Sequence, residues 1–105
     1  MVQVRSRARF RHAEGIEARE VGDELFLTLP ELGTIHHLNQ MAKAAWHALN
    51  TPRSSAELIA LFEQAFPETP KRKIAKDIGK LMRFFEDNKL IVLVPDGVRP
   101  RSEPR

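Results

Sequence analysis

The chain contains no cysteine. This absence excludes disulfide bonds, thiolate metal ligands and thiol nucleophiles, and with them several classes of enzyme. Long apolar runs are also lacking, because the stretch from Leu90 to Pro95 falls far short of the roughly 20 residues that a membrane span needs. The arginine-rich start has no apolar segment of the kind found in secretory signals. We therefore expect a cytoplasmic protein that makes no use of a membrane.

Recognisable catalytic motifs are absent as well. The five glycines are scattered, so there is no glycine-rich phosphate-binding loop, and no His-Glu-x-x-His motif occurs. Ser54 and Ser55 lack the context of a nucleophilic serine and are better explained as helix caps. The carboxylates of residues 14–24 are expected on a solvated face, which is a poor setting for acid–base catalysis. We expect no catalytic residue, no cofactor and no enzymatic activity.

Two adjacent histidines, His36 and His37, raise the question of a metal site. Adjacent residues of a strand point to opposite faces, so these two side chains cannot readily converge on one ion. His12 and His47 are too dispersed in the sequence to complete a ligand set. We therefore expect no metal, with one histidine of the pair at a packed or partner-facing position and the other in solvent.

The net charge of +3 is unevenly distributed along the chain. Residues 1–13 carry four arginines and no acid, residues 14–70 carry three bases against nine acids, and residues 71–89 carry seven bases against three acids. Such a polarised charge distribution steers and orients binding partners. We predict a basic mobile arm over residues 1–13, one domain over residues 14–95 and a disordered tail over residues 96–105.

The first half of the domain has the pattern of strands. Residues 16–21 and 24–29 alternate apolar and polar side chains around a turn at Gly22-Asp23, and a second turn at residues 30–33 leads into the segment TIHHL, residues 34–38. Three strands in a meander are stable only when a helix covers one face. We therefore predict a three-stranded antiparallel sheet within residues 16–39.

Three helices are predicted between residues 40 and 90. Asn39 caps the first, Ser54 or Ser55 caps the second, and Pro70 suits the first turn of the third. The side chains expected to point inward from the second helix are Leu58, Ile59, Leu61, Phe62, Ala65 and Phe66. The predicted common core contains Trp46, Leu58, Phe62, Ile78, Leu81 and Phe85. After the third helix, the run LIVLV is either a final strand or an extended tail on the core.

Phe84 is the residue of the third helix that the core explains least well. It lies about 100° around the helix from Phe85, on the side of Lys73, Asp77 and Lys80, so one of the two phenylalanines should reach the edge of the core or lie beyond it. An exposed aromatic ring beside basic residues suits a groove for a partner, although a partly covered surface aromatic fits the spacing nearly as well.

The order of these elements resembles the coenzyme PQQ synthesis protein D (PqqD) family. The segments that carry the resemblance are LTLPELGTIHHLNQMAKAAWHAL, SSAELIALFEQAF and IAKDIGKLMRFFEDNKLI, and together they cover about residues 16–93. Asp77 stands at the acidic position typical of the family. Lys89 departs from the family pattern, which often has glycine there, and the basic N-terminal arm is an addition.

The resemblance implies an α+β, winged-helix-like fold in which a three-stranded antiparallel sheet is followed by a three-helix bundle. Members of the family are described as chaperones that hold the leader segment of a ribosomally synthesised precursor peptide and present it to a modifying enzyme, often of the radical SAM type. The leader adds as a strand beside the third β-strand and lies against the third helix. The peptide-binding residues that this implies are Thr34, Ile35, His36, His37, Leu38, Lys73, Asp77, Lys80, Leu81 and Phe84. The resemblance does not specify which face of the third helix lines the groove.

The competing hypothesis is a winged-helix regulator that binds nucleic acid through the segment KRKIAKDIGK, residues 71–80, and through the arginine-rich arm. Against it, residues 14–95 are net acidic and Asp77 interrupts the basic residues. The sequence therefore favours peptide binding over nucleic-acid binding. Exposed strand edges would also permit a homodimer.

Overall fold

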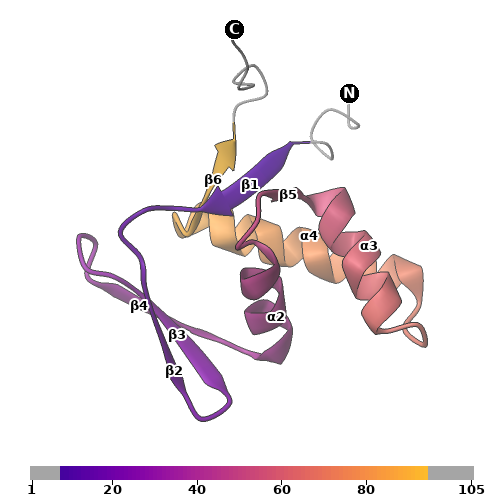
Figure 1. The fold of residues 1–105 in the computed structure, drawn as a ribbon, viewed down its shortest axis with the longest axis horizontal. Helices are drawn as coiled ribbons and strands as arrows, with labels where there is room; N and C mark the ends of the chain where they lie inside the picture. Colours follow the sequence, from indigo (N-terminus) through magenta and orange to yellow (C-terminus); the bar gives the residue numbers. More distant parts are fainter. Residues whose placement is uncertain (1–7, 95–105) are drawn as a thin grey trace, which may run out of the picture.

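The structure is a computed structural model that describes residues 8–94, and these form three helices and six strands. The elements follow in the order β1 (Arg9–His12), β2 (Glu17–Val21), β3 (Glu24–Leu29), β4 (Thr34–Leu38), α2 (Gln40–Ala48), β5 (Arg53–Ser54), α3 (Ser55–Ala65), α4 (Lys71–Asp87) and β6 (Ile91–Val94). Figure 1 shows β2, β3 and β4 as a sheet at the lower left, with the helices to its right and β1 and β6 at the top of the view.

The strands β2, β3 and β4 form an antiparallel meander with β3 in the centre. Val21 pairs with Glu24, so a turn of two residues joins β2 to β3, and its first residue, Gly22, has a φ of 62°. Glycine takes this conformation without the steric penalty that a side chain would bring. The three-stranded antiparallel sheet predicted within residues 16–39 is confirmed.

This sheet buries only one of its faces. Leu25, Leu27 and Leu29 of β3 are buried, whereas every residue of β2 is exposed. Helix α2 contacts β3 and β4. Because side chains alternate between the two faces of a strand, α2 covers the leucine face and the opposite face stays open.

Helices α2 and α3 begin at residues whose side chains cap them. The Ala42 N–H donates to the side chain of Asn39 over 2.8 Å at the start of α2. At the start of α3, the Ser54 hydroxyl accepts from the Glu57 N–H at 3.1 Å, and the Glu57 carboxylate accepts from the Ser54 N–H at 2.9 Å. This capping box satisfies two backbone donors at once. The three predicted helices are confirmed, and none of those within residues 8–94 has the length and apolar character that crossing a bilayer requires.

One hydrophobic core joins the sheet to the helices. Trp46, Leu58, Phe62, Ile78 and Phe85 are buried, as predicted. Leu81 packs against the same core but is only partly buried. The predicted core is therefore confirmed, with Leu81 at its edge.

The inward-facing surface predicted for α3 is too wide. Leu58 and Phe62, four residues apart, are buried, but Leu61 is 37% exposed and Phe66 is 50% exposed. Ala65 is exposed too. Leu61 lies beside the buried stripe, and Phe66 follows the last helical residue with φ −129° and ψ 68°, so its side chain leaves the helical pattern.

A second sheet, with the strand order β5, β1, β6, corrects two predictions. The N-terminal arm predicted as mobile over residues 1–13 includes β1, which pairs with β6 over four residues and buries Phe10. The predicted order of a sheet followed by helices is also incomplete, because β5 lies between α2 and α3 and β6 follows α4. The run LIVLV contributes a strand. The rest of the predicted arm, residues 1–7, and the predicted tail, residues 96–105, lie outside the described residues.

Candidate functional site

Strand β4 forms an edge of the first sheet. It pairs with β3 on one side, and no strand among residues 8–94 pairs with its other side. It contains neither proline nor lysine, two residue types that commonly protect edge strands from pairing. Its free side therefore presents backbone hydrogen-bonding groups that another extended chain can use.

The register of the sheet identifies which backbone groups are free. Glu24 is the first residue of β3 after the two-residue turn, so its backbone N–H and C=O groups bond to Val21 of β2. Along a strand, the N–H and C=O groups of successive residues point alternately to the two neighbouring strands. Leu27, three residues after Glu24, therefore bonds to β4, where its partner is His36. It follows that the N–H and C=O groups of Ile35 and His37 point away from the sheet. A docking strand would bond to these two residues rather than to His36.

The two adjacent histidines diverge, as strand alternation requires. The rings of His36 and Phe84 are nearly perpendicular, with 5.7 Å between their centroids. His37 lies on the opposite face, 5.0 Å from the Phe26 ring centroid, and its Nε2 is 3.4 Å from a carboxylate oxygen of Glu24. Within residues 8–94, no group of three or more histidine, aspartate or glutamate side chains is placed to hold a metal ion.

A groove of about 400 Å³ runs between the end of β4, the start of α2 and the side of α4. It is lined by Asn39, Met41, Ala42, Asp77, Lys80, Leu81 and Phe84. Four residues predicted for the site on α4 therefore come together on one face of the helix, and Phe84 is 36% exposed there. This is the face that the sequence left open. The contact between Phe84 and His36 joins the groove to the edge strand.

The other predicted residues lie around this groove. Thr34 and His36 are half-buried on the helix-facing side of β4, and Leu38 is fully buried in the core. Ile35 and His37 point to the open face of the sheet, where Ile35 is 68% exposed. The sequence did not identify Asn39, Met41 and Ala42 as site residues, although their position directly after the edge strand is a signal for them.

Lys73 and Asp77 form an ion pair at the end of the groove. The Lys73 Nζ lies 2.7 Å from Asp77 Oδ2, one helical turn away. The hydrogen bond from Lys73 lowers the pKa of the Asp77 carboxyl. Burial opposes this shift, and the charges of Lys73, Lys80 and Lys76 add to it. Asp77 is therefore ionised at neutral pH, and Lys73 already balances its charge.

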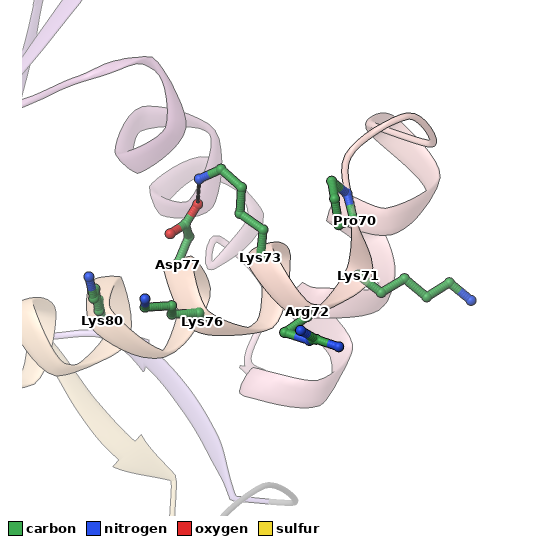
Figure 2. A pocket seen from close by; sticks show the side chains of 7 residues that line it. All are labelled: Pro70, Lys71, Arg72, Lys73, Lys76, Asp77 and Lys80. Carbon is green, nitrogen blue, oxygen red and sulfur yellow. Dashed lines mark hydrogen bonds and ion pairs between the residues drawn. The ribbon is translucent and has the colours of Figure 1, made fainter.

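The N-terminal half of α4 presents a basic surface beyond the groove (Figure 2). It is lined by Pro70, Lys71, Arg72, Lys73, Lys76, Asp77 and Lys80. Figure 2 shows Lys73 and Asp77 leaning together while Lys71 points away from Lys76 and Lys80. The helix has no side-chain cap and no acidic residue in its first turn, where Lys71, Arg72 and Lys73 add to the positive end of the helix dipole. The surface is suited to anionic groups.

Other polar side chains have structural roles. Burial lowers the pKa of His12, whose ring stacks on Trp46 at 3.6 Å and whose Nε2 hydrogen bonds to the Trp46 carbonyl at 2.8 Å. The Ser54 N–H lowers the pKa of Glu57, helped by Arg9, whose guanidinium is 3.0 Å from that carboxylate. These contacts tie β1 to α2 and α3. They are not arranged as a nucleophile with its base.

Comparison with known proteins gives a consistent result. The family model of coenzyme PQQ synthesis protein D (PqqD) matches residues 24–91. The curated proteins contain no match. The fold is similar to that of TbiB1 in complex with the TbiA(beta) leader peptide, with a TM-score of 0.71 and 15% identity over 82% of this chain and 99% of that one. It is also similar to a lasso peptide synthetase B1 complexed with the leader peptide, with a TM-score of 0.68 and 20% identity over 79% and 96% of the two chains.

Proposed function

The chain belongs to the coenzyme PQQ synthesis protein D (PqqD) family, and we propose that it is a non-catalytic chaperone for the leader segment of a ribosomally synthesised precursor peptide. The leader adds as a strand to β4, and the protein presents it to a modifying enzyme. Two proteins of the same fold have structures in complex with leader peptides, which supports this assignment.

The observation that carries the proposal is the free edge of β4 beside the groove on α4. An extended peptide on this edge would gain backbone hydrogen bonds from Ile35 and His37, and such bonds supply affinity for almost any sequence. Its alternate side chains would point toward His36 and Phe84. Strand addition and a lined groove together give affinity and selectivity at one place.

The proposed roles of the site residues follow from their positions. Thr34 to Leu38 form the docking strand. Leu81 and Phe84 offer apolar contact to the peptide, and Lys80 offers a positive charge at the rim of the groove. Lys73 and Asp77 hold each other in place at its far end. None of these residues needs to be a catalyst in this role.

The wider setting of the function is part of the same proposal. The modifying enzyme is of the radical SAM type, the three helices and the first sheet are arranged as in winged-helix proteins, and the site operates in the cytoplasm. The free edges also allow two copies to associate. A nucleic-acid-binding role has less support, because residues 14–70 carry nine acids against three bases and would repel a polyanion.

The test uses a display library of random peptides, from which the tightest binder is selected and synthesised with a fluorescent label. Ile35→Pro removes a free backbone donor, whereas Ile35→Ala keeps it and removes only the exposed side chain. We expect the proline variant to bind about threefold to tenfold more weakly than the alanine variant, as the loss of one hydrogen bond predicts. Circular dichroism must show that both variants are folded.

His36→Pro is the control for the direction in which the backbone N–H groups of β4 point. Its N–H points toward β3, so this variant should lose thermal stability much more than Ile35→Pro. Equal binding by the two Ile35 variants, or amide shifts on peptide addition that avoid residues 34–38, would contradict strand addition. Tight binding of duplex DNA with a steep dependence on salt, and no selected peptide, would favour the nucleic-acid alternative.

A further inference from the structure

The basic surface of α4 contains a row of three cations along one side of the helix. Arg72, Lys76 and Lys80 follow one another at intervals of four residues, and all three are exposed. Within residues 8–94, none of the three forms an ion pair. Like charges at this spacing lie side by side on a helix and destabilise it slightly. Lys76 and Lys80 are attracted to Asp77, but its carboxylate is already paired with Lys73, so a bound anion would relieve the repulsion along the row.

The row leads directly to the docking strand. The residue four positions after Lys80 is Phe84, which meets His36 of β4. Lys80 lines both the basic surface and the groove. A peptide that leaves the edge of β4 along α4 would therefore pass Lys80 first and Lys76 second. Lys73 does not compete for it, because its charge is paired with Asp77.

The spacing of the row matches an extended peptide. Four residues of an α-helix rise about 6 Å. Two residues of an extended strand rise about 6.6 Å and bring side chains back to the same face. Side chains at alternate positions of an extended peptide would thus come into register with Phe84, Lys80 and Lys76 in succession, and those opposite the two lysines would be acidic.

The direction of the peptide fixes which of its ends is acidic. The first sheet is antiparallel throughout, and antiparallel pairing is the slightly more stable arrangement. An antiparallel peptide on β4 has its N-terminal end near Leu38, and the groove continues from there past Asn39 toward Lys80. The acidic positions therefore precede the residue that faces His36.

We propose that this protein selects leaders that carry two acidic residues in alternation, two and four positions before the residue that faces His36, with Lys80 and Lys76 as their respective partners. This proposal rests on the proposed function, because it takes the bound peptide as a strand on β4. It adds a sequence pattern by which candidate precursor peptides can be compared.

The test starts from the selected peptide described above. Three versions with the same composition place two glutamates in this segment at alternate positions, at adjacent positions or three positions apart. We expect the alternate version to bind about threefold to tenfold more tightly than the others, the range that two exposed ion pairs predict. Lys76→Glu should abolish this preference, and a lysine placed four positions before the His36-facing residue should restore tight binding to that variant.

Lys71→Glu is the matched control, with the same change of charge. Lys71 belongs to the same basic surface, but its side chain points away from Lys76 and Lys80 (Figure 2). This variant should keep the preference for alternate glutamates. Equal affinity of the three peptides overturns the acidic pattern, and so does an equal loss of preference in Lys71→Glu and Lys76→Glu. Strand addition still stands in either case if the amide shifts map to residues 34–38. A selected peptide that does not perturb residues 34–38, or the absence of any selected peptide, overturns both proposals.

Discussion

At the scale of single residues, His12 connects β1 to the core through an interaction that depends on its protonation. Its ring stacks on Trp46 with an interplanar angle of 5° and bonds to the Trp46 carbonyl. Burial lowers the pKa of His12 from the ordinary value of 6.5, while the hydrogen bond to the carbonyl opposes the shift and the charge of His47 adds to it. The folded state therefore favours the neutral ring.

This shift predicts how stability depends on pH. A group with a lowered pKa in the folded state stabilises the fold above its unfolded pKa, and that stabilisation is lost as the pH falls through the folded value. The melting temperature should therefore fall as the pH is lowered below 6.5. In His12→Gln, which keeps a planar donor but does not titrate, the fall should be smaller. Melting curves of both proteins at several pH values provide the measurement, and parallel curves would refute a role for His12.

At the scale of elements, β1 is a strand that the sequence did not predict. Phe10 is 3% exposed and lies opposite Leu93 in the pairing with β6. Phe10→Ala should lower the free energy of unfolding by about 3–5 kcal/mol, since it removes a buried aromatic side chain. Leu93→Ala, at a position that is 52% exposed, should cost much less. Urea denaturation compares the two, and similar small losses would show that β1 contributes little to stability.

The first sheet and the helices could be predicted because their signals are local. The alternating leucines of β3 and the caps Asn39 and Ser54 each lie within a few residues of the elements that they specify. The second sheet has no local signal, since Arg9 pairs with Val94 at the other end of the described chain. The four arginines of residues 1–13 favoured a mobile arm, and the single Phe10 between them was too weak a sign of burial.

The candidate site was predictable in its elements and less so in its geometry. Helical spacing indicated that Phe84 departs from the core, and it does lie at the groove. The sequence alone does not distinguish residues 35, 36 and 37 as partners for a docking strand. Only the pairing register of β3 with β4 shows that the free backbone groups belong to Ile35 and His37. Lys73 was predicted as a binding residue, yet its ion pair with Asp77 exists only once the helix has formed.

At the scale of the whole molecule, the charges form two opposed regions. Residues 14–70 carry three bases against nine acids, while residues 71–89 carry seven bases against three acids. Such a field orients a charged ligand before contact and acts mainly on the rate of association. An acidic peptide should therefore approach with its acidic end toward α4.

Lys71→Glu tests this long-range effect because Lys71 lies away from the row of cations. It should slow the association of the alternate-glutamate peptide by about twofold to tenfold at low salt and leave the dissociation rate nearly unchanged. At high salt the difference from the unchanged protein should disappear, since mobile ions screen exposed charges. Stopped-flow fluorescence at two salt concentrations gives both rates. A faster dissociation would mean instead that Lys71 touches the peptide.

The pairing of β1 with β6 has a mechanical consequence. Arg9 lies opposite Val94 and His12 opposite Ile91, so the described chain enters and leaves the domain at the same end of one antiparallel pair. A force that pulls residues 9 and 94 apart loads the outermost bonds first and opens the pair one bond at a time, as a zipper opens. Strands loaded along their length would share the force among all bonds at once. A protease motor that pulls on either end would thus begin unfolding at this pair, while the sheet that carries β4 is spared at first.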